Sequence, residues 1–238
     1  MSIKTLINRA IYGLGLEIDG FPNEGVAVFG YWIRPRRAQG PEGPFRAGPG
    51  LERCLQLNAH SVMDVGSGGG AQATAFANAG LAVTCVDYGS SVYAQVATHP
   101  EGHRLILGDF NTLDLDETFD LVWSSHCLEH QRNVGLFLEN MVKFTSPDGW
   151  ICITVPVCHR AMWGGHLTLW TPGLLAYNLA LTGADVSKAE LIHGHREFSV
   201  LFQPRKRPLP DGLTYDSGDI EKLADRLPSW CREGADSW

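Results

Sequence analysis

Residues 62–70 read Val-Met-Asp-Val-Gly-Ser-Gly-Gly-Gly, and this stretch decides the fold class. A short apolar run bounded by turn residues predicts a buried strand. The glycines at 66, 68 and 70 permit positive φ and let a ligand lie against bare backbone. Residues 71–79 then predict a helix. Strand, glycine loop and helix together predict a nucleotide site at the carboxyl end of a sheet.

The spacing of the glycines bears on which nucleotide binds. Dinucleotide sites use G-x-G-x-x-G, which keeps a helix N-terminus open to the pyrophosphate. This loop instead reads G-x-G-x-G, with Asp64 two residues before the first glycine. A dehydrogenase that binds NAD(H) is therefore a competing hypothesis that the spacing disfavours.

The composition limits the class of protein. The chain has 238 residues and 44% hydrophobic content, enough for one α/β domain with terminal additions. Its formal net charge of -7 disfavours a nucleic-acid partner, because phosphate binding needs a basic surface. Six cysteines without a C-x-x-C pair favour a reducing, cytoplasmic setting without a zinc site. No run of about 20 apolar residues is present, so we expect no transmembrane helix.

Predicted strands and helices alternate from residue 51 onward, which favours a mostly parallel sheet with helices on both faces. The strand cores are apolar throughout, as burial on two faces requires. The predicted strands cover residues 61–65, 81–86, 103–107, 119–124, 149–155 and two stretches near 185–193 and 197–203. The predicted helices cover residues 51–59, 70–79, 90–97, 132–145 and 172–182.

Two segments before residue 51 have patterns of their own. Residues 2–14 carry apolar side chains at helical spacing, which predicts a lid or core helix, with weak membrane-surface contact as the alternative. Residues 20–50 are rich in glycine and proline and predict a loop or linker. Within them, residues 31–37 combine aromatic and guanidinium groups, which suits a sugar, phosphate or carboxylate ligand, or else a solvated turn.

These patterns divide the chain into three parts. Residues 1–50 form an N-terminal helix and a substrate or lid segment, and residues 51–203 form the main domain, with an insertion at 156–172. Residues 204–238 form a C-terminal tail, in which 219–227 predict a short exposed helix and the remainder is expected to be loose.

Acidic residues follow the second and third predicted strands of the main domain. Asp87 can accept hydrogen bonds from both hydroxyls of a ribose, and Asp109 can accept one from an exocyclic amine. Phe110 can lie on a base. Glycines, two carboxylates and few cations form a poor pyrophosphate site but a good site for a neutral or cationic nucleoside. A sulfonium nucleoside with an ammonium group fits this description.

Five motifs together resemble the class I S-adenosylmethionine-dependent methyltransferases, within their small-molecule and glycan branch. The resemblance covers residues 51–203 and implies a doubly wound, mostly parallel seven-stranded sheet, with the last strand, near 197–203, antiparallel. S-adenosylmethionine would be the cofactor and S-adenosylhomocysteine the product. The motifs are VMDVGSGGG (62–70), VDYG (86–89), GDF (108–110), FDLVWSSHCLEH (119–130) and SPDGWICITVP (146–156).

The resemblance also implies roles for the first two strand ends. Gly66, Gly68 and Gly70 would line the methionine part of the cofactor. Asp64 would hold the loop, and Asp87 would grip the ribose.

The next two strand ends would complete the cofactor site by the same resemblance. Asp109 and Phe110 would hold the adenine, and Tyr88 would pack either on adenine or on protein. The backbone at Ser124 and Ser125 would face the ammonium group.

Four histidines lie beside predicted strand ends, where the methyl acceptor would bind: His126, His130, His159 and His166. A hydroxyl acceptor benefits from a general base with a pKa near 7, which histidine supplies. The resemblance makes His130 and His166 the best candidates for that base, although each could instead bind or support. His126 and His130 also have the spacing of a two-histidine metal site with Glu129 between them, but no third ligand is identifiable, so we predict no metal.

The sequence therefore predicts methyl transfer to oxygen of a small molecule or glycan. Nitrogen or carbon methylation of a metabolite is the alternative within enzymes. A non-catalytic nucleoside-binding module is the alternative outside them.

Overall fold

The computed structural model describes residues 46–231 except 92–93, 95–96 and 159–164, together with the backbone of three short strands nearer the N-terminus. The chain divides into two compact units, Met1–Phe45 and Arg46–Trp238. The three-part division of the sequence stays a prediction.

The first unit contains a small antiparallel sheet. Its strands are β1 (Leu16–Asp19), β2 (Val26–Val28) and β3 (Tyr31–Pro35), in the order β1-β3-β2. The loop predicted for residues 20–50 is therefore wrong in part, because two of these strands fall inside it. The helix predicted at 2–14 lies outside the described residues, and so do the side chains of residues 31–37.

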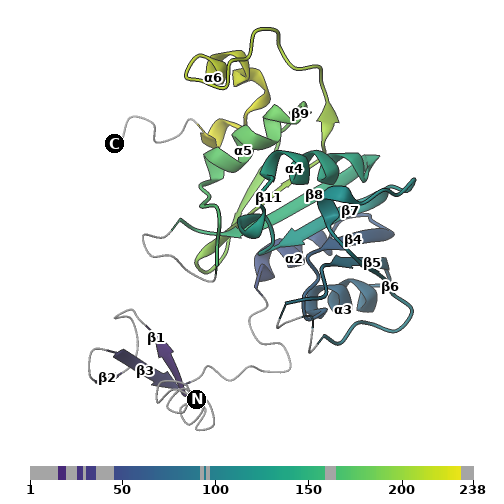
Figure 1. Cartoon of the computed structure of the whole chain (residues 1–238), viewed down its shortest axis with the longest axis vertical. Coiled ribbons are helices and arrows are strands. Elements are labelled where there is room, and N and C mark those ends of the chain that lie inside the picture. Colours follow the sequence, from purple (N-terminus) through teal and green to yellow (C-terminus); the bar gives the residue numbers. More distant parts are fainter. Residues whose placement is uncertain are drawn as a thin grey trace. The chain divides into compact units, whose positions relative to one another are not determined.

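The second unit is built on a seven-stranded sheet of order β10-β11-β8-β7-β4-β5-β6 (Figure 1). The strand β11 is antiparallel to both of its neighbours, and the other strand pairs of this sheet are parallel. This arrangement confirms the predicted fold. The strands are β4 (Ser61–Val65), β5 (Ala82–Asp87), β6 (Arg104–Leu107), β7 (Phe119–Ser125), β8 (Thr145–Pro156), β10 (Glu190–His193) and β11 (Glu197–Phe202).

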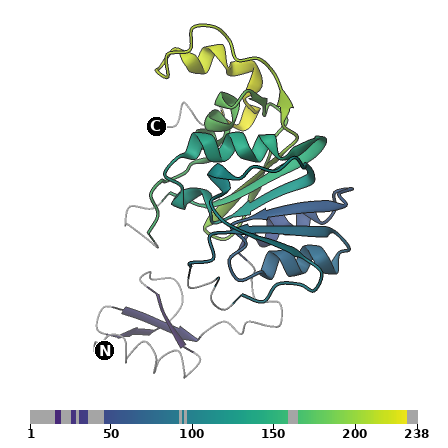
Figure 2. The same cartoon turned by 45° about the vertical axis from the view of Figure 1, so that its right-hand side comes forward.

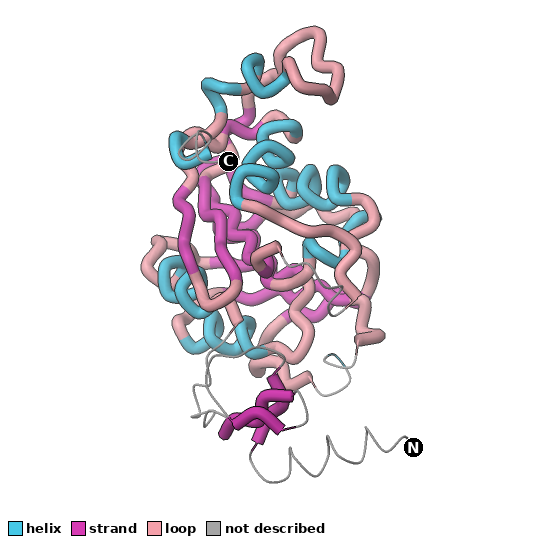
Figure 3. Tube along the Cα trace, turned by 90° about the vertical axis from the view of Figure 1, so that its left-hand side faces the viewer, coloured by secondary structure: helices cyan, strands magenta, loops and turns pink. Residues whose placement is uncertain are grey.

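Helices cover both faces of this sheet (Figures 1 and 2). The helices α2 (Gly48–Cys54) and α3 (Ala71–Asn78) pack on one face, and α4 (Val134–Lys143) and α5 (Pro172–Leu181) pack on the other. Figure 3 shows the strands passing between the two sets of helices.

The two faces of the sheet bury two separate cores. Successive side chains of a strand point to opposite faces. In β4, Val62 joins the core under α2 and α3, whereas Met63 and Val65 join the core under α4 and α5. In the first of these cores, Trp123 meets Phe76 edge-to-face at 5.5 Å between ring centroids. Each strand therefore needs an unbroken apolar run, which is the pattern that predicted it.

Side-chain caps explain where two helices begin. The Asn133 side chain accepts a hydrogen bond from the Leu136 amide at the start of α4. Thr171 does the same for the Leu174 amide at the start of α5, where Pro172 follows as the first helical residue.

Several helices and strands begin or end at other residues than the sequence predicts. The helix predicted at 51–59 ends at Cys54, and the strand predicted from 149 begins at Thr145, which pairs with Phe119. The strand predicted near 185–193 is two strands, because β9 (Ala184–Asp185) leaves the main sheet to pair with β12 (Arg205–Lys206). The helix predicted at 90–97 falls partly outside the described residues.

The tail packs on the domain between Asp219 and Cys231, whereas residues 205–218 are mostly exposed. It contains α6 (Asp219–Lys222) and two short 3₁₀ turns, Ala224–Arg226 and Ser229–Cys231. Leu223 is fully buried, and the Trp230 indole donates to the Ala189 carbonyl at 2.9 Å. The prediction of a short exposed helix is confirmed in part: the helix ends at Lys222 and Ile220 is 56% exposed, whereas Asp219 and Leu223 are buried. Within the described residues, no helix has the length and apolar run needed to cross a membrane.

Candidate active site

The glycine loop follows β4 directly and is shaped by its backbone. Gly66, Gly68 and Gly70 have φ of 78°, 49° and 80°, values that side-chain-bearing residues rarely adopt. A Cβ on Gly66 would lie 2.7 Å from the Cβ and Sγ of Cys127, and one on Gly70 would lie 2.5 Å from the Thr98 carbonyl oxygen. Glycine is therefore required at both ends of this loop.

Asp87, the last residue of β5, holds the loop in place. Its Oδ2 accepts a hydrogen bond from the Gly68 amide at 2.9 Å, and its Oδ1 accepts one from the Gly89 amide at 2.7 Å. A carboxylate offers about four acceptor directions, so about two remain for the hydroxyls of a ribose.

Asp64 is buried beneath the loop, with 2% of its surface exposed. Burial, and then the charge of Asp87, raise the pKa of its carboxyl to about 7, although the Ala73 amide partly offsets them. Its Oδ2 has no hydrogen-bond partner among the described residues. A buried carboxylate oxygen without a donor is unfavourable, which agrees with a carboxyl that tends to keep its proton.

Residues 108–112 form the turn after β6. Asp109 caps a 3₁₀ turn (Phe110–Thr112) by accepting from the Asn111 amide at 2.8 Å. Burial of the Tyr88 hydroxyl, and then its hydrogen bond to Asp109, raise the pKa of Tyr88 to about 12. The Tyr88 side chain is still 57% exposed, so its ring is free to cover a ligand.

Phe110 requires a correction. Its ring is 5% exposed and packs against Phe137 and Phe144, at 5.0 and 5.7 Å between centroids. The 3₁₀ turn directs the ring into the core, so the expectation that it lies on adenine is wrong. The Phe110 backbone remains at the candidate site, and Asn111 is the neighbouring polar side chain that the sequence reading missed.

The end of β7 leads into the histidine cluster, which we define as His126, Glu129, His130, His166 and Glu197. Ser124 and Ser125 close the strand, with Ser124 fully buried and Ser125 partly buried. His126 follows at φ 52°, and its amide donates to the Thr154 carbonyl at 3.0 Å. The 3₁₀ turn Leu128–His130 comes next and supplies two members of the cluster.

His126 lies between two carboxylates of this cluster. Its Nε2 is 2.7 Å from Glu197 Oε2, and its Nδ1 is 3.3 Å from Glu129 Oε1. Burial favours a low pKa for His126, but the hydrogen bonds and charges of Glu129 and Glu197 outweigh it and raise that pKa. The two carboxylates therefore favour the protonated form of His126.

The side chains of His130 and His166 lie next to each other. Their rings lie edge-to-face at 5.0 Å between centroids. The backbone carbonyl of Glu129 accepts from the amides of Leu167 and Thr168 at 2.8 and 3.1 Å, which ties the loop carrying His166 to this turn. Burial lowers the pKa of His166, which Glu129 partly offsets.

Glu129 lies under this pair, with 1% of its side chain exposed, and its Oε1 is 3.9 Å from His166 Nε2. Donor atoms of Glu129, His130 and His166 come within 4.8 Å of one another, a spacing at which a cation can be considered. His166 is thus a third possible metal ligand beside Glu129 and His130, so the expectation that no third ligand is present was wrong. The absence of a metal stays a prediction. His159 lies outside the described residues.

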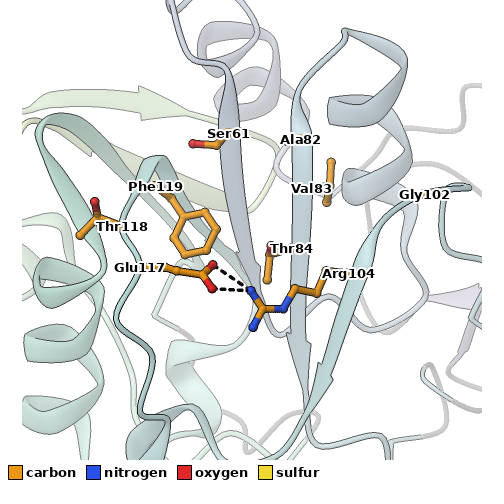
Figure 4. Close-up of a pocket in the computed structure, with 9 residues that line it drawn as sticks. All are labelled: Ser61, Ala82, Val83, Thr84, Gly102, Arg104, Glu117, Thr118 and Phe119. Carbon is orange, nitrogen blue, oxygen red and sulfur yellow. Dashed lines mark hydrogen bonds and ion pairs between the residues drawn. The ribbon is translucent and has the colours of Figure 1, made fainter.

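A shallow pocket of about 450 Å³ lies at the opposite edge of the sheet (Figure 4). It is lined by the first residues of four strands, Ser61, Ala82, Arg104 and Phe119. Arg104 and Glu117 form an ion pair in it at 2.8 Å. Since ligands of parallel sheets bind at the carboxyl ends of the strands, this pocket is not the nucleotide site.

A sheet of this order with one antiparallel strand, a glycine loop after β4 and a carboxylate ending β5 define the class I fold of the S-adenosylmethionine-dependent methyltransferases. Residues 63–153 match the family described as the methyltransferase domain. Residues 63–153 are therefore similar to the methyltransferase domain, and the resemblance of the motifs is confirmed.

Curated relatives and solved structures agree with this fold. A ubiquinone biosynthesis O-methyltransferase of Rickettsia conorii is 31% identical over 97 residues, which cover 39% of this chain and 34% of that protein. This chain covers less than half of such relatives, from 34% to 44% of their own length.

Two solved structures show the same fold. The 1,6-didemethyltoxoflavin-N1-methyltransferase of Burkholderia thailandensis, with bound S-adenosylhomocysteine, has a TM-score of 0.52 and 24% identity, over 63% of this chain and 73% of its own. CalS10, an amino pentose methyltransferase of Micromonospora echinaspora, has a TM-score of 0.52 and 19% identity, over 65% of this chain and 89% of its own.

Proposed function

We propose that this chain is an S-adenosylmethionine-dependent methyltransferase that methylates an oxygen of a small molecule. The observation that carries the proposal is the loop geometry: Asp87 holds the Gly68 amide at 2.9 Å, and Asp64 lies buried beside it without a donor for one oxygen. This site suits a nucleoside with a nearby cationic group.

In this proposal the cofactor lies along the carboxyl ends of β4 to β7. The glycine loop lines its methionine part, and Asp87 accepts from the ribose hydroxyls. Asp109, Tyr88 and the Phe110 backbone surround the adenine. The backbone at Ser125, with Asp64, faces the ammonium group.

The acceptor would lie over the histidine cluster. Its hydroxyl oxygen attacks the methyl carbon in line with the sulfur, the carbon–sulfur bond breaks, and S-adenosylhomocysteine leaves as the neutral thioether. The hydroxyl proton passes to His166 or His130, whose rings are paired at 5.0 Å. The electrophile is already activated, so position and removal of water supply the rest of the catalysis.

The acceptor class is the least constrained part of the proposal. An O-methyltransferase among the relatives supports oxygen, and a neighbour described as an amino pentose methyltransferase supports including sugars and glycans. Nitrogen methylation is the second candidate, because another neighbour is an N1-methyltransferase and Glu129 could hold an ammonium. An amine acceptor needs no strong base, so loss of His166 would affect it little.

The remaining expectations concern partners and place. We propose a small-molecule acceptor rather than nucleic acid, in keeping with the net charge of -7. Cysteine usage without C-x-x-C pairs supports a cytoplasmic setting.

Isothermal titration of the full chain with S-adenosylmethionine, S-adenosylhomocysteine and NADH tests the proposal. We expect binding of the first two, no binding of NADH, and at least about tenfold weaker binding to Asp87→Ala because two loop amides and the ribose lose an acceptor. Absence of heat and of a thermal shift with S-adenosylmethionine would overturn it. An acceptor screen that detects homocysteine release then separates an enzyme from a non-catalytic module.

A further inference from the structure

A row of buried charged side chains leads from β11 to the candidate base. Glu197 begins β11, and its Oε2 is 2.7 Å from His126 Nε2. His126 Nδ1 is 3.3 Å from Glu129 Oε1, and the same oxygen is 3.9 Å from His166 Nε2. Glu197 is 71 residues from His126 in the chain, so folding alone brings this row together.

We propose that Glu197 and His126 are positioning residues, which hold the Glu129 side chain in place beneath His166. The proposal rests on the proposed function. Glu129 would then orient His166 through its Nε2 proton and leave Nδ1 open toward the acceptor. The distance of 3.9 Å is longer than a hydrogen bond, as is common for catalytic pairs before the substrate binds.

The charges of the row support this assignment. An imidazole can donate from both ring nitrogens only when it is protonated, and both nitrogens of His126 face carboxylates. Two carboxylates and one imidazolium carry a net charge of about -1. Without His126, Glu129 would be a buried carboxylate with no cation in contact, which is strongly unfavourable.

The surroundings hold Glu197 in one place. Its Oε1 accepts from the Ala47 amide at 2.6 Å, at the start of α2. Gly194 leaves room for its side chain, since a Cβ there would lie 2.7 Å from Glu197 Cγ. His126 keeps its positive φ while its amide donates to β8. Three separate elements thus define the position of this one side chain.

Other charged groups near His166 are accounted for. Glu129 raises its pKa, while His130, His126 and Arg46 lower it. Glu129 and Glu197 are the charged groups that act on His126. Glu197 therefore influences His166 through His126 and Glu129, which makes a specific prediction about its charge.

We call the influence of Glu197 on His166, through His126 and Glu129, the relay. Substitution of Glu197 tests this relay in the full chain with S-adenosylhomocysteine and EDTA present. In Glu197→Gln the row loses one negative charge, and His126 then faces the carboxylate of Glu129 alone. We therefore expect the pKa of His166, followed by NMR, to fall. In Glu197→Asp the charge remains, and His166 titrates closer to the wild-type protein. Once an acceptor is found, Glu197→Gln and His126→Gln lower kcat about tenfold or more at an unchanged affinity for S-adenosylmethionine.

Glu190→Gln is the matched control. Glu190 lies on the neighbouring strand β10 and pairs with Arg53 of α2 at 2.7 Å, but its side chain is 41% exposed and outside the row. Identical His166 titrations in Glu197→Gln and Glu190→Gln would overturn the proposal. If wild-type protein does not bind S-adenosylmethionine, the proposed function fails, whereas the titrations still report on the relay. Should Glu197→Gln fail to fold, unchanged His166 titration in His126→Gln would overturn the relay instead.

Discussion

The glycine loop and the histidine cluster lie at the same edge of one sheet, yet they are built in opposite ways. The loop is set by backbone geometry within a strand, a turn and a helix, and Asp87 stabilises it from the adjacent strand. The cluster is set by side chains from three segments, with His126 and Glu197 joined across 71 residues. The two regions therefore differ in what builds them, which is local backbone shape in the loop and side chains from distant segments in the cluster.

The test with the largest expected effect asks whether the histidine cluster acts in catalysis while the glycine loop acts only in binding the cofactor. Replacing the candidate base in His166→Ala should lower kcat about 10²- to 10⁴-fold, or about 3–5 kcal/mol of barrier, if the acceptor is a hydroxyl. The affinity for S-adenosylmethionine should not change, because the loop is untouched. Steady-state kinetics and titration calorimetry measure the two effects, with the exposed His193→Ala as control. A loss of less than about threefold would point to an amine acceptor.

The next test concerns the buried carboxylate under the loop. Because the pKa of Asp64 is raised to about 7 from an ordinary value near 4, the folded state holds a proton that the unfolded state has lost. Stability should therefore fall as pH rises from about 4 to 7, by up to about 4 kcal/mol, and Asp64→Asn should flatten this slope. Urea denaturation of cofactor-free protein at several pH values measures it.

Asp120→Asn provides a control of opposite sign. The His60 amide and then the Ser61 amide hold the pKa of Asp120 low, so its contribution is present above its ordinary pKa and disappears as pH falls below it. Equal slopes in the wild-type protein and Asp64→Asn would contradict the assignment of Asp64.

A smaller effect is expected from the backbone of the loop. Gly70→Ala adds a Cβ at φ 80° and 2.5 Å from the Thr98 carbonyl, so the free energy of unfolding should fall by roughly 2–3 kcal/mol. Gly69→Ala is the matched control, since its Cβ meets no heavy atom within 4 Å and its φ is not in the left-handed region. Thermal unfolding and cofactor affinity distinguish them. Equal effects of the two alanines would show that loop shape is not what glycine provides.

The smallest expected effect is that of removing metal. The donor atoms of Glu129, His130 and His166 spread over up to 4.8 Å, whereas ligands of one zinc ion at about 2.1 Å lie closer together, and Glu129 already faces the charged His126. EDTA should therefore leave methyl transfer unchanged, and Zn²⁺ should bind more weakly than micromolar in calorimetry. Tight stoichiometric binding that His166→Ala abolishes would turn the cluster into a metal site and remove the base assignment.

The sequence predicted the strands of the main sheet because each is an apolar run buried on two faces, as Val62 and Met63 show by entering opposite cores. It failed at Phe110, since residue type suggested stacking while the 3₁₀ turn directs the ring into the core. It also did not predict that the residues after the short tail helix pack on the domain. The apolar side chains of Leu223 and Trp230 are too few to form a periodic pattern in the sequence. In the structure Leu223 is buried, and Trp230 is tied to the domain by its hydrogen bond to the Ala189 carbonyl.

By itself the sequence determined the class of fold and the shape of the loop after β4, because positive φ and close backbone approach at Gly66 and Gly70 can be met only by glycine, and only locally. Only the tertiary structure decided that Glu197 faces His126 and that Glu129 lies under His166. Those contacts depend on how the start of β11 and the loop before α5 meet the turn that follows β7. Side-chain proximity between distant segments leaves no periodic signal in a single chain, so it could be seen only after folding.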